Sequence, residues 1–181
     1  GYRTAQLEGA HVEYLRGVHN PIGIKVGPKS APSDVCALLD RLDPEREPGR
    51  ITLISRMGEG AAQEALPALI RAVRSSEHPV LWSCDPMHGN TETAEGGRKT
   101  RRVERIFAEL EQTFATHAQE GSRLGGVHFE MTGEAVTECL GGSLEVSEAD
   151  LPRNYETACD PRLNGSQALE MAFRIAELLR A

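Results

Sequence analysis

Short apolar runs alternate with longer helical patterns along most of this sequence, and this alternation is the feature that most constrains its fold. Runs that end at turn-forming residues predict four buried strands, at residues 22–26, 51–55, 80–83 and 127–131. Apolar residues recur at helical spacing over residues 7–18, 34–43, 61–75, 100–120 and 167–179. Strands separated by helices pair in parallel. We therefore predict an α/β fold with four parallel strands, half the number in a (β/α)8 TIM barrel.

Length and composition narrow the class of protein further. The 181 residues suffice for one domain, expected over residues 1–181 without an internal linker. A net charge of -7 argues against a nucleic-acid or anionic-membrane surface, and no apolar run reaches the length of a membrane span. The four cysteines have no CxxC spacing, which favours free thiols in a reducing cytoplasm. Strand ends also lack GxGxxG and P-loop motifs.

Polar side chains follow every predicted strand. Lys25, Arg56, Asp85 with His88, and Glu130 all fall at carboxyl ends of strands, where parallel sheets and barrels place their active sites. Lys25 and Arg56 on neighbouring strands would give an anion two cationic contacts. The alternative is that each cation only extends to solvent from a strand end.

An imidazole and two carboxylates offer a mixed nitrogen and oxygen ligand set. His88 and Glu130 lie on successive strand ends, and Asp160 lies in the loop before the last helix. Such a set suits Mn²⁺, Fe²⁺, Co²⁺ or Zn²⁺. The long spacing gives no local metal signature, so a structural histidine remains an alternative, and His128 competes because it shares a strand face with Glu130.

Several other polar residues have simpler interpretations. Cys84 could act as a nucleophile only with a base such as His88, and its place on the strand instead favours packing against helices. Cations at residues 98–102 are disfavoured at a helix start, so an anion near the strand ends would explain them. Glu134, Glu138 and Glu145 are expected on a solvated loop face.

Four segments together resemble one enzyme family. They are NPIGIKVGP at residues 20–28, WSCDPMHGNT at 82–91, HFEMTGEAVTECLGG at 128–142, and CDPRLN at 159–164. This pattern resembles the C-terminal part of the class II (plant-type) 3-deoxy-D-arabino-heptulosonate 7-phosphate (DAHP) synthases. The resemblance implies a transferase on a (β/α)8 barrel that condenses phosphoenolpyruvate with erythrose 4-phosphate, the first step of the shikimate pathway to aromatic amino acids.

The resemblance also implies roles for individual residues. His88, Glu130 and Asp160 match three of the family's four ligands to a divalent metal ion, for which manganese is expected. The fourth ligand is a cysteine on a strand that this chain does not contain. Lys25, Arg56 and Arg3 match phosphoenolpyruvate-binding positions, and with His88 the first two are the expected catalytic residues. Lys99 matches a basic position on the sugar-phosphate side. Tyr2 stands where the family has the acid of Gly-Glu-Arg-Thr, within the expected substrate-binding motif.

Because the resemblance covers only the C-terminal part of the family, we expect an N-terminal half-barrel chain or segment to complete the site. A higher oligomer is also expected. Two alternatives stay open at this point. One is a related synthase that uses another aldehyde, such as an amino-sugar phosphate in secondary metabolism, and the other is a non-catalytic relic that binds or regulates a partner.

Overall fold

The structure is a computed structural model that describes residues 1–180, and of Tyr2 it describes the backbone alone. Three short 3-10 turns accompany the helices and strands. The elements are, in chain order, η1 (Tyr2–Thr4), α1 (Ala10–Arg16), β1 (Ile22–Val26), α2 (Pro32–Leu42), β2 (Ile51–Ser55), α3 (Ala61–Ser75), β3 (Leu81–Cys84), η2 (His88–Asn90), β4 (Thr91–Thr93), β5 (Lys99–Arg101), α4 (Val103–Gln119), β6 (Gly126–Val127), η3 (Leu151–Arg153) and α5 (Gly165–Leu178).

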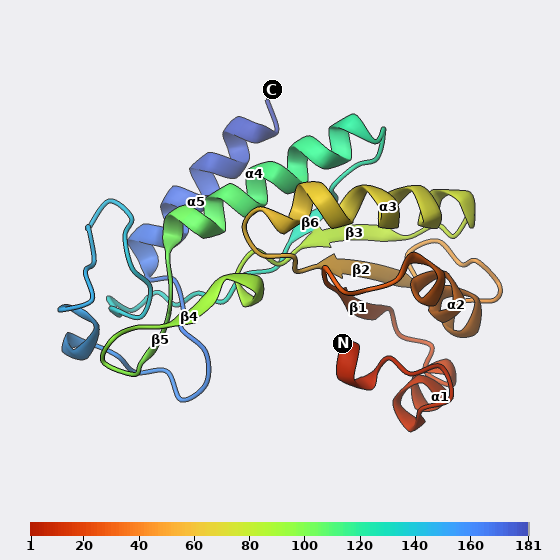
Figure 1. Cartoon of the computed structure of the whole chain (residues 1–181), viewed down its shortest axis with the longest axis horizontal. Helices are drawn as coiled ribbons and strands as arrows, with labels where there is room; N and C mark the ends of the chain where they lie inside the picture. The colour runs from red at the N-terminus through yellow and green to blue at the C-terminus, as the bar shows by residue number, and fades with distance from the viewer. Residues whose placement is uncertain (181) are drawn as a thin grey trace.

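A parallel sheet in the order β1-β2-β3-β6 forms the centre of the fold. β1 and β2 pair over their full length, and β6 pairs with the end of β3. A further parallel bridge joins Met131 to Leu163, so the backbone continues the sheet direction past β6. The predicted α/β fold with four parallel strands is confirmed (Figure 1).

The helices cover one face of this sheet. α3 packs against both α2 and α4, and α4 packs against α5, so the helices form a continuous outer layer (Figure 1). In β1, Ile22, Ile24 and Val26 are buried in the core, whereas Gly23 is exposed and Lys25 is half-buried. Parallel sheets are usually covered on both faces. Here the face opposite the helices is only partly covered.

The structure corrects two predicted boundaries and shows how the last helix is capped. Residues 99–101, expected to begin a helix, instead form β5 and pair antiparallel with β4, so α4 begins at Val103. β6 ends at Val127 rather than at residue 131. α5 begins at Gly165, because the Asn164 side chain caps it by accepting a hydrogen bond from the backbone amide of Gln167 at 3.0 Å.

Two expectations drawn from composition can be compared with the structure. All four cysteines are free, as their spacing predicted. Within residues 1–180, no helix combines the length and the apolar character that crossing a membrane requires.

One carboxylate of α4 is buried in the core without a cationic partner among the described residues. Glu109 is fully buried, and burial raises the pKa of its carboxyl to about 7 from the ordinary 4.5, although hydrogen bonds from the backbone amides of Met57 and Gly58 partly oppose this. Between these two pH values the folded chain holds a proton that the unfolded chain has released. The contribution of Glu109 to stability is therefore full below pH 4.5 and is lost as the pH rises through about 7.

We expect Glu109→Gln to remove this pH dependence. Relative to the variant, the wild-type chain should lose on the order of 3 kcal/mol of unfolding free energy as the pH rises from 4.5 to 7. Urea denaturation of both proteins across this range measures the difference. Parallel stability curves for the two proteins would show that the carboxyl titrates normally.

Candidate active site at the strand ends

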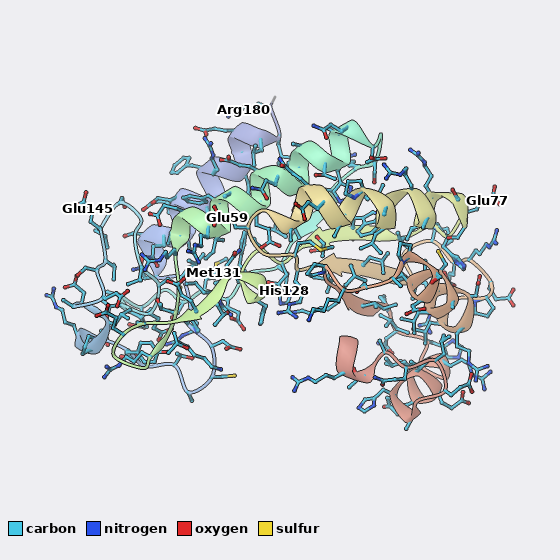
Figure 2. All side chains as sticks on the ribbon, in the orientation of Figure 1. Glu59, Glu77, His128, Met131, Glu145 and Arg180 are labelled. Atoms are coloured by element: carbon cyan, nitrogen blue, oxygen red, sulfur yellow. The ribbon has the colours of Figure 1, made fainter. Side chains whose placement is uncertain are left out.

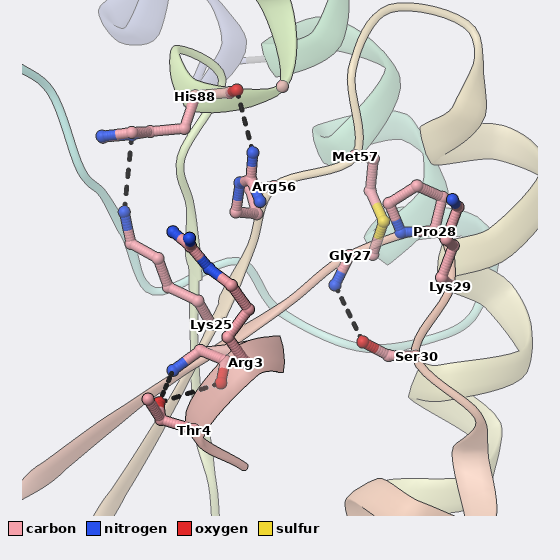
Figure 3. Close-up of a pocket in the computed structure, with 12 residues that line it drawn as sticks. Arg3, Thr4, Lys25, Gly27, Pro28, Lys29, Ser30, Arg56, Met57 and His88 are labelled. Carbon is pink, nitrogen blue, oxygen red and sulfur yellow. Dashed lines mark hydrogen bonds between the residues drawn. The ribbon is translucent and has the colours of Figure 1, made fainter. Parts of the chain in front are cut away.

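The carboxyl ends of the strands border a cavity of about 690 Å³. Lys25 near the end of β1, Arg56 directly after β2 and His88 after β3 all line it, together with Arg3 from η1 (Figure 3). The structure therefore brings together residues that are up to 85 positions apart, between Arg3 and His88. Lys25 and Arg56 line the same cavity, as their positions on neighbouring strands predicted.

The cavity has a strongly positive lining. Four cationic side chains, Arg3, Lys25, Lys29 and Arg56, line it, and no Asp or Glu is among its described lining residues. Within residues 1–180, Arg3 and Lys29 form no ion pair or hydrogen bond through their side chains. The chain as a whole carries a net charge of -7, so this local excess of cations is distinctive. Such a cavity favours an anion with more than one charged group.

A buried carboxylate behind the cavity holds two of the site residues. Asp85 Oδ2 accepts a hydrogen bond from Lys25 Nζ at 2.6 Å and lies 2.7 Å from His88 Nδ1. The backbone amides of Met87 and His88 also donate to Asp85 Oδ1, each at 3.1 Å. Burial raises the pKa of the Asp85 carboxyl, but hydrogen bonds from Lys25 and His88 outweigh it and hold this pKa below its usual range.

The contact with Asp85 sets which nitrogen of His88 carries hydrogen. A carboxylate only accepts hydrogen bonds, so His88 Nδ1 is the donor to Asp85, and a neutral His88 would present its lone pair at Nε2. His88 Nε2 lies 3.2 Å from Glu130 Oε1, which is also an acceptor. Two acceptors this close require a proton or a metal ion between them. This donor arrangement fits a metal ligand whose imidazole is oriented by a carboxylate.

Asp160 completes a group that could hold one metal ion. The candidate ligand atoms of His88, Glu130 and Asp160 all lie within 4.8 Å of one another, and all three residues are partly buried. They come from the segment after β3, the segment after β6 and the loop before α5. An imidazole with two carboxylates suits a borderline or harder divalent ion.

Two cationic side chains of β5 pair with the carboxylates of Glu130 and Asp160. Arg101 is fully buried, and its Nη1 donates to Glu130 Oε2 at 2.6 Å. Lys99 Nζ donates to Asp160 Oδ1 at 3.3 Å. Burial raises the pKa of the Asp160 carboxyl, but the Lys99 contacts outweigh it, so the pKa stays below its usual range. Arg101 and Lys99 belong to β5, the strand that the sequence did not predict.

The remaining candidates have varied positions. His128 lies near the group, with its ring centroid 6.2 Å from that of His88, and Figure 2 shows His128 and Met131 between the sheet and the β4–β5 hairpin. Cys84 is buried against α4, where its thiol donates to Thr113 Oγ1 at 3.5 Å, as the sequence predicted. Tyr2 lies in η1, and its side chain lies outside the described part of the structure.

One prediction about the loop before α5 is wrong. Glu138, expected on a solvated face, is fully buried. It accepts hydrogen bonds from Arg162 Nη2 at 2.6 Å and from the backbone amides of Thr157 at 2.9 Å and Arg162 at 2.8 Å. Glu138 thus anchors the loop that carries Asp160. A buried carboxylate needs such partners, and only the position of Glu138 within the 128–142 motif hinted at them.

The basic run at residues 98–102 also has an explanation different from the expected one. Three of its four cations pair with carboxylates of this chain: Arg101 with Glu130, Lys99 with Asp160, and Arg102 Nε with Glu92 Oε1 at 2.8 Å. Asp85 was predicted at a strand end near the active site, but its contacts with Lys25 and His88 were not. Its place before Pro86 indicated a turn, whereas its contact with Lys25 spans 60 residues.

Comparisons with known proteins identify the family of the chain. The profile of the Class-II DAHP synthetase family matches residues 1–176. The chain is 54% identical to the phospho-2-dehydro-3-deoxyheptonate aldolase of Neurospora crassa, over 99% of this chain and 38% of that protein. It is 51% identical to the phospho-2-dehydro-3-deoxyheptonate aldolase AroG of Mycolicibacterium smegmatis, over 99% of this chain and 39% of that protein. The chain therefore spans well under half the length of these relatives, and it belongs to the Class-II DAHP synthetase family.

Proposed function

We propose that this chain provides the phosphoenolpyruvate-binding and metal-binding part of a DAHP synthase. The observation that carries the proposal is the adjacency of two complementary sites. A cavity lined by Arg3, Lys25, Lys29 and Arg56 opens beside His88, which also faces Glu130 across 3.2 Å. One site suits a phosphorylated carboxylate, and the other suits a divalent ion.

The residues of the chain would act mainly by binding and orientation. Lys25 and Arg56 would hold phosphoenolpyruvate with its C3 toward the aldehyde of erythrose 4-phosphate, which converts a bimolecular step into an oriented one. Arg3 would contribute to the same binding, and Lys99 would lie toward the sugar phosphate. Asp85 would hold the Lys25 ammonium and the His88 imidazole in place, through its contacts at 2.6 Å and 2.7 Å.

His88, Glu130 and Asp160 would hold the divalent ion, with Mn²⁺ as the expected metal and Co²⁺, Fe²⁺ or Zn²⁺ as alternatives. When bound, the ion would supply Lewis acidity toward the aldehyde carbonyl. Arg101 and Lys99 would limit the negative charge of the site by pairing with Glu130 and Asp160.

We further propose that residues 1–181 act as one domain that another segment or chain completes. The partly covered face of the sheet supports this, since Gly23 is exposed and Thr52 and Ile54 of β2 are only half-buried. Parallel strands normally have both faces covered, and a closed barrel has no free edges. The relatives also extend far beyond the matched region.

Replacing His88 should remove metal binding. We expect His88→Ala to weaken Mn²⁺ binding by roughly 100-fold or more, because the variant loses the only nitrogen ligand in the proposed set. His128→Ala is the matched control, since its ring is 6.2 Å from that of His88 but outside the three-residue group. Isothermal titration with Mn²⁺ measures both. Equal losses in the two variants, or none in His88→Ala, would contradict the assignment.

If another segment completes the site, synthase activity should require both this chain and that segment. The 181-residue chain should be combined with the part of the Neurospora crassa relative that precedes the matched region. With Mn²⁺, phosphoenolpyruvate and erythrose 4-phosphate, we expect phosphate release only from the mixture, and none when the chain carries His88→Ala.

A stable mixture without activity toward any aldehyde would contradict the synthase and favour a non-catalytic binding role. Activity with an amino-sugar phosphate but not with erythrose 4-phosphate would retain the reaction class and overturn the proposed substrate.

A further inference from the structure

A side chain of helix α4 contacts both loops that carry the cavity residues. The fully buried Glu109 accepts a hydrogen bond at Oε1 from the backbone amide of Met57 at 2.7 Å. At Oε2 it accepts one from Asn90 Nδ2 at 2.8 Å. Met57 directly follows Arg56, and Asn90 lies two residues after His88. One carboxylate therefore joins the loop of Arg56 to the loop of His88.

Asn90 extends this connection in both directions. Its Oδ1 accepts from the backbone amide of Glu59 at 2.9 Å, and its Nδ2 donates to the Pro86 carbonyl at 2.8 Å. Together, Glu109 and Asn90 form what we call the Glu109–Asn90 bracket, a buried pair that links residues 56–60 to residues 85–91.

The two loops also touch directly, backbone against backbone. A Cβ atom added at Gly89 would lie only 2.4 Å from the backbone nitrogen of Gly58, so no larger residue fits there without movement. Arg56 Nη2 donates to the His88 carbonyl at 2.9 Å. The separation of the Arg56 and His88 backbones is therefore fixed from the side of the cavity and from the side of α4.

If Glu109 served only to pack the core, a carboxylate at this position would be unfavourable. Burying a carboxylate without a cation is costly, and an apolar residue at this position of α4 would avoid that cost. Burial accordingly raises the pKa of Glu109. The residue has no ion-pair partner among residues 1–180, and its hydrogen bonds go to Met57, Gly58 and Asn90. A role in holding the loops accounts for a carboxylate here.

We propose that Glu109 and Asn90 are positioning residues that fix Arg56 relative to His88, and so couple anion binding in the cavity to divalent-ion binding at His88, Glu130 and Asp160. The choice of phosphoenolpyruvate and Mn²⁺ as ligands rests on the proposed function. The bracket itself can be tested without either ligand.

Hydrogen exchange measured by NMR on the ligand-free chain above pH 7, where Glu109 is ionised, tests the bracket. Glutamine replaces one carboxylate oxygen by an NH2 group that only donates, so Glu109→Gln cannot accept at both positions where Met57 and Asn90 donate. We expect the amides of Met57 and Glu59 to exchange roughly 10-fold faster or more, and the ring signals of His88 to shift.

Leu110→Val is the matched control for this measurement. Leu110 is equally buried and is the next residue of α4, but it belongs to the apolar core. The control should lower overall stability while leaving the difference in exchange between these amides and the core unchanged. Unchanged exchange at Met57 and Glu59 in Glu109→Gln, or the same selective loosening in Leu110→Val, would overturn the bracket.

Titration calorimetry with Mn²⁺ and phosphoenolpyruvate tests the coupling. In the wild-type chain each ligand should raise the affinity of the other, by the same factor in both orders of addition. Glu109→Gln should lose most of this factor, whereas Leu110→Val should retain it. Full coupling in a Glu109→Gln chain with loosened loops would overturn the coupling. A wild-type chain that binds neither ligand would contradict both the proposed function and the coupling, and the exchange data would still decide on the bracket.

Discussion

The site depends on the buried carboxylate of Asp85. It accepts from Lys25 Nζ at 2.6 Å, lies 2.7 Å from His88 Nδ1, and accepts from the backbone amides of Met87 and His88. A buried carboxylate is stable only when its acceptor sites are satisfied, and here these four groups satisfy it. Because Lys25 lines the cavity and His88 belongs to both the cavity lining and the candidate metal group, one carboxylate contacts residues of both sites.

Two further buried carboxylates hold the loops near Asp85. Glu109 holds the segments after β2 and β3 from α4, and Glu138 holds the loop that carries Asp160 through Arg162 and backbone amides. Among the described residues that line the cavity at the strand ends, neither Glu109 nor Glu138 occurs. Loops at the ends of parallel strands carry function but have little regular structure of their own. Buried carboxylates behind these loops, one on α4 and one in a neighbouring loop, therefore supply the order that the loops lack.

Local patterns predicted much of the fold. β1, β2 and α3 have the predicted bounds because apolar periodicity and flanking turn residues define them within a few positions. The hairpin of β4 and β5 could not be predicted in this way. Its strands are short and polar, and they are held by contacts such as that between Arg101 and Glu130, which are distant in sequence.

The same distinction applies to the site. Lys25, Arg56, His88 and Glu130 could be selected because each is a polar residue at the end of an apolar strand. Arg101, Glu109 and Glu138 could not, because their importance lies in contacts across the tertiary structure, and the same holds for the contact between Asp85 and Lys25. Glu138 was even expected on the surface, since a charged residue in a loop is usually solvated and its partner, Arg162, lies 24 residues away.

The central claim is that His88, Glu130 and Asp160 together hold one divalent ion beside the cationic cavity. A crystal structure of the chain grown with Mn²⁺, with anomalous differences recorded for manganese, tests this most directly. We expect a single strong peak at bonding distance from His88 Nε2 and from carboxylate oxygens of Glu130 and Asp160, with His88 Nδ1 still hydrogen-bonded to Asp85. A manganese peak elsewhere, or fully loaded crystals in which His88 remains against Glu130 with no ion between them, would contradict it.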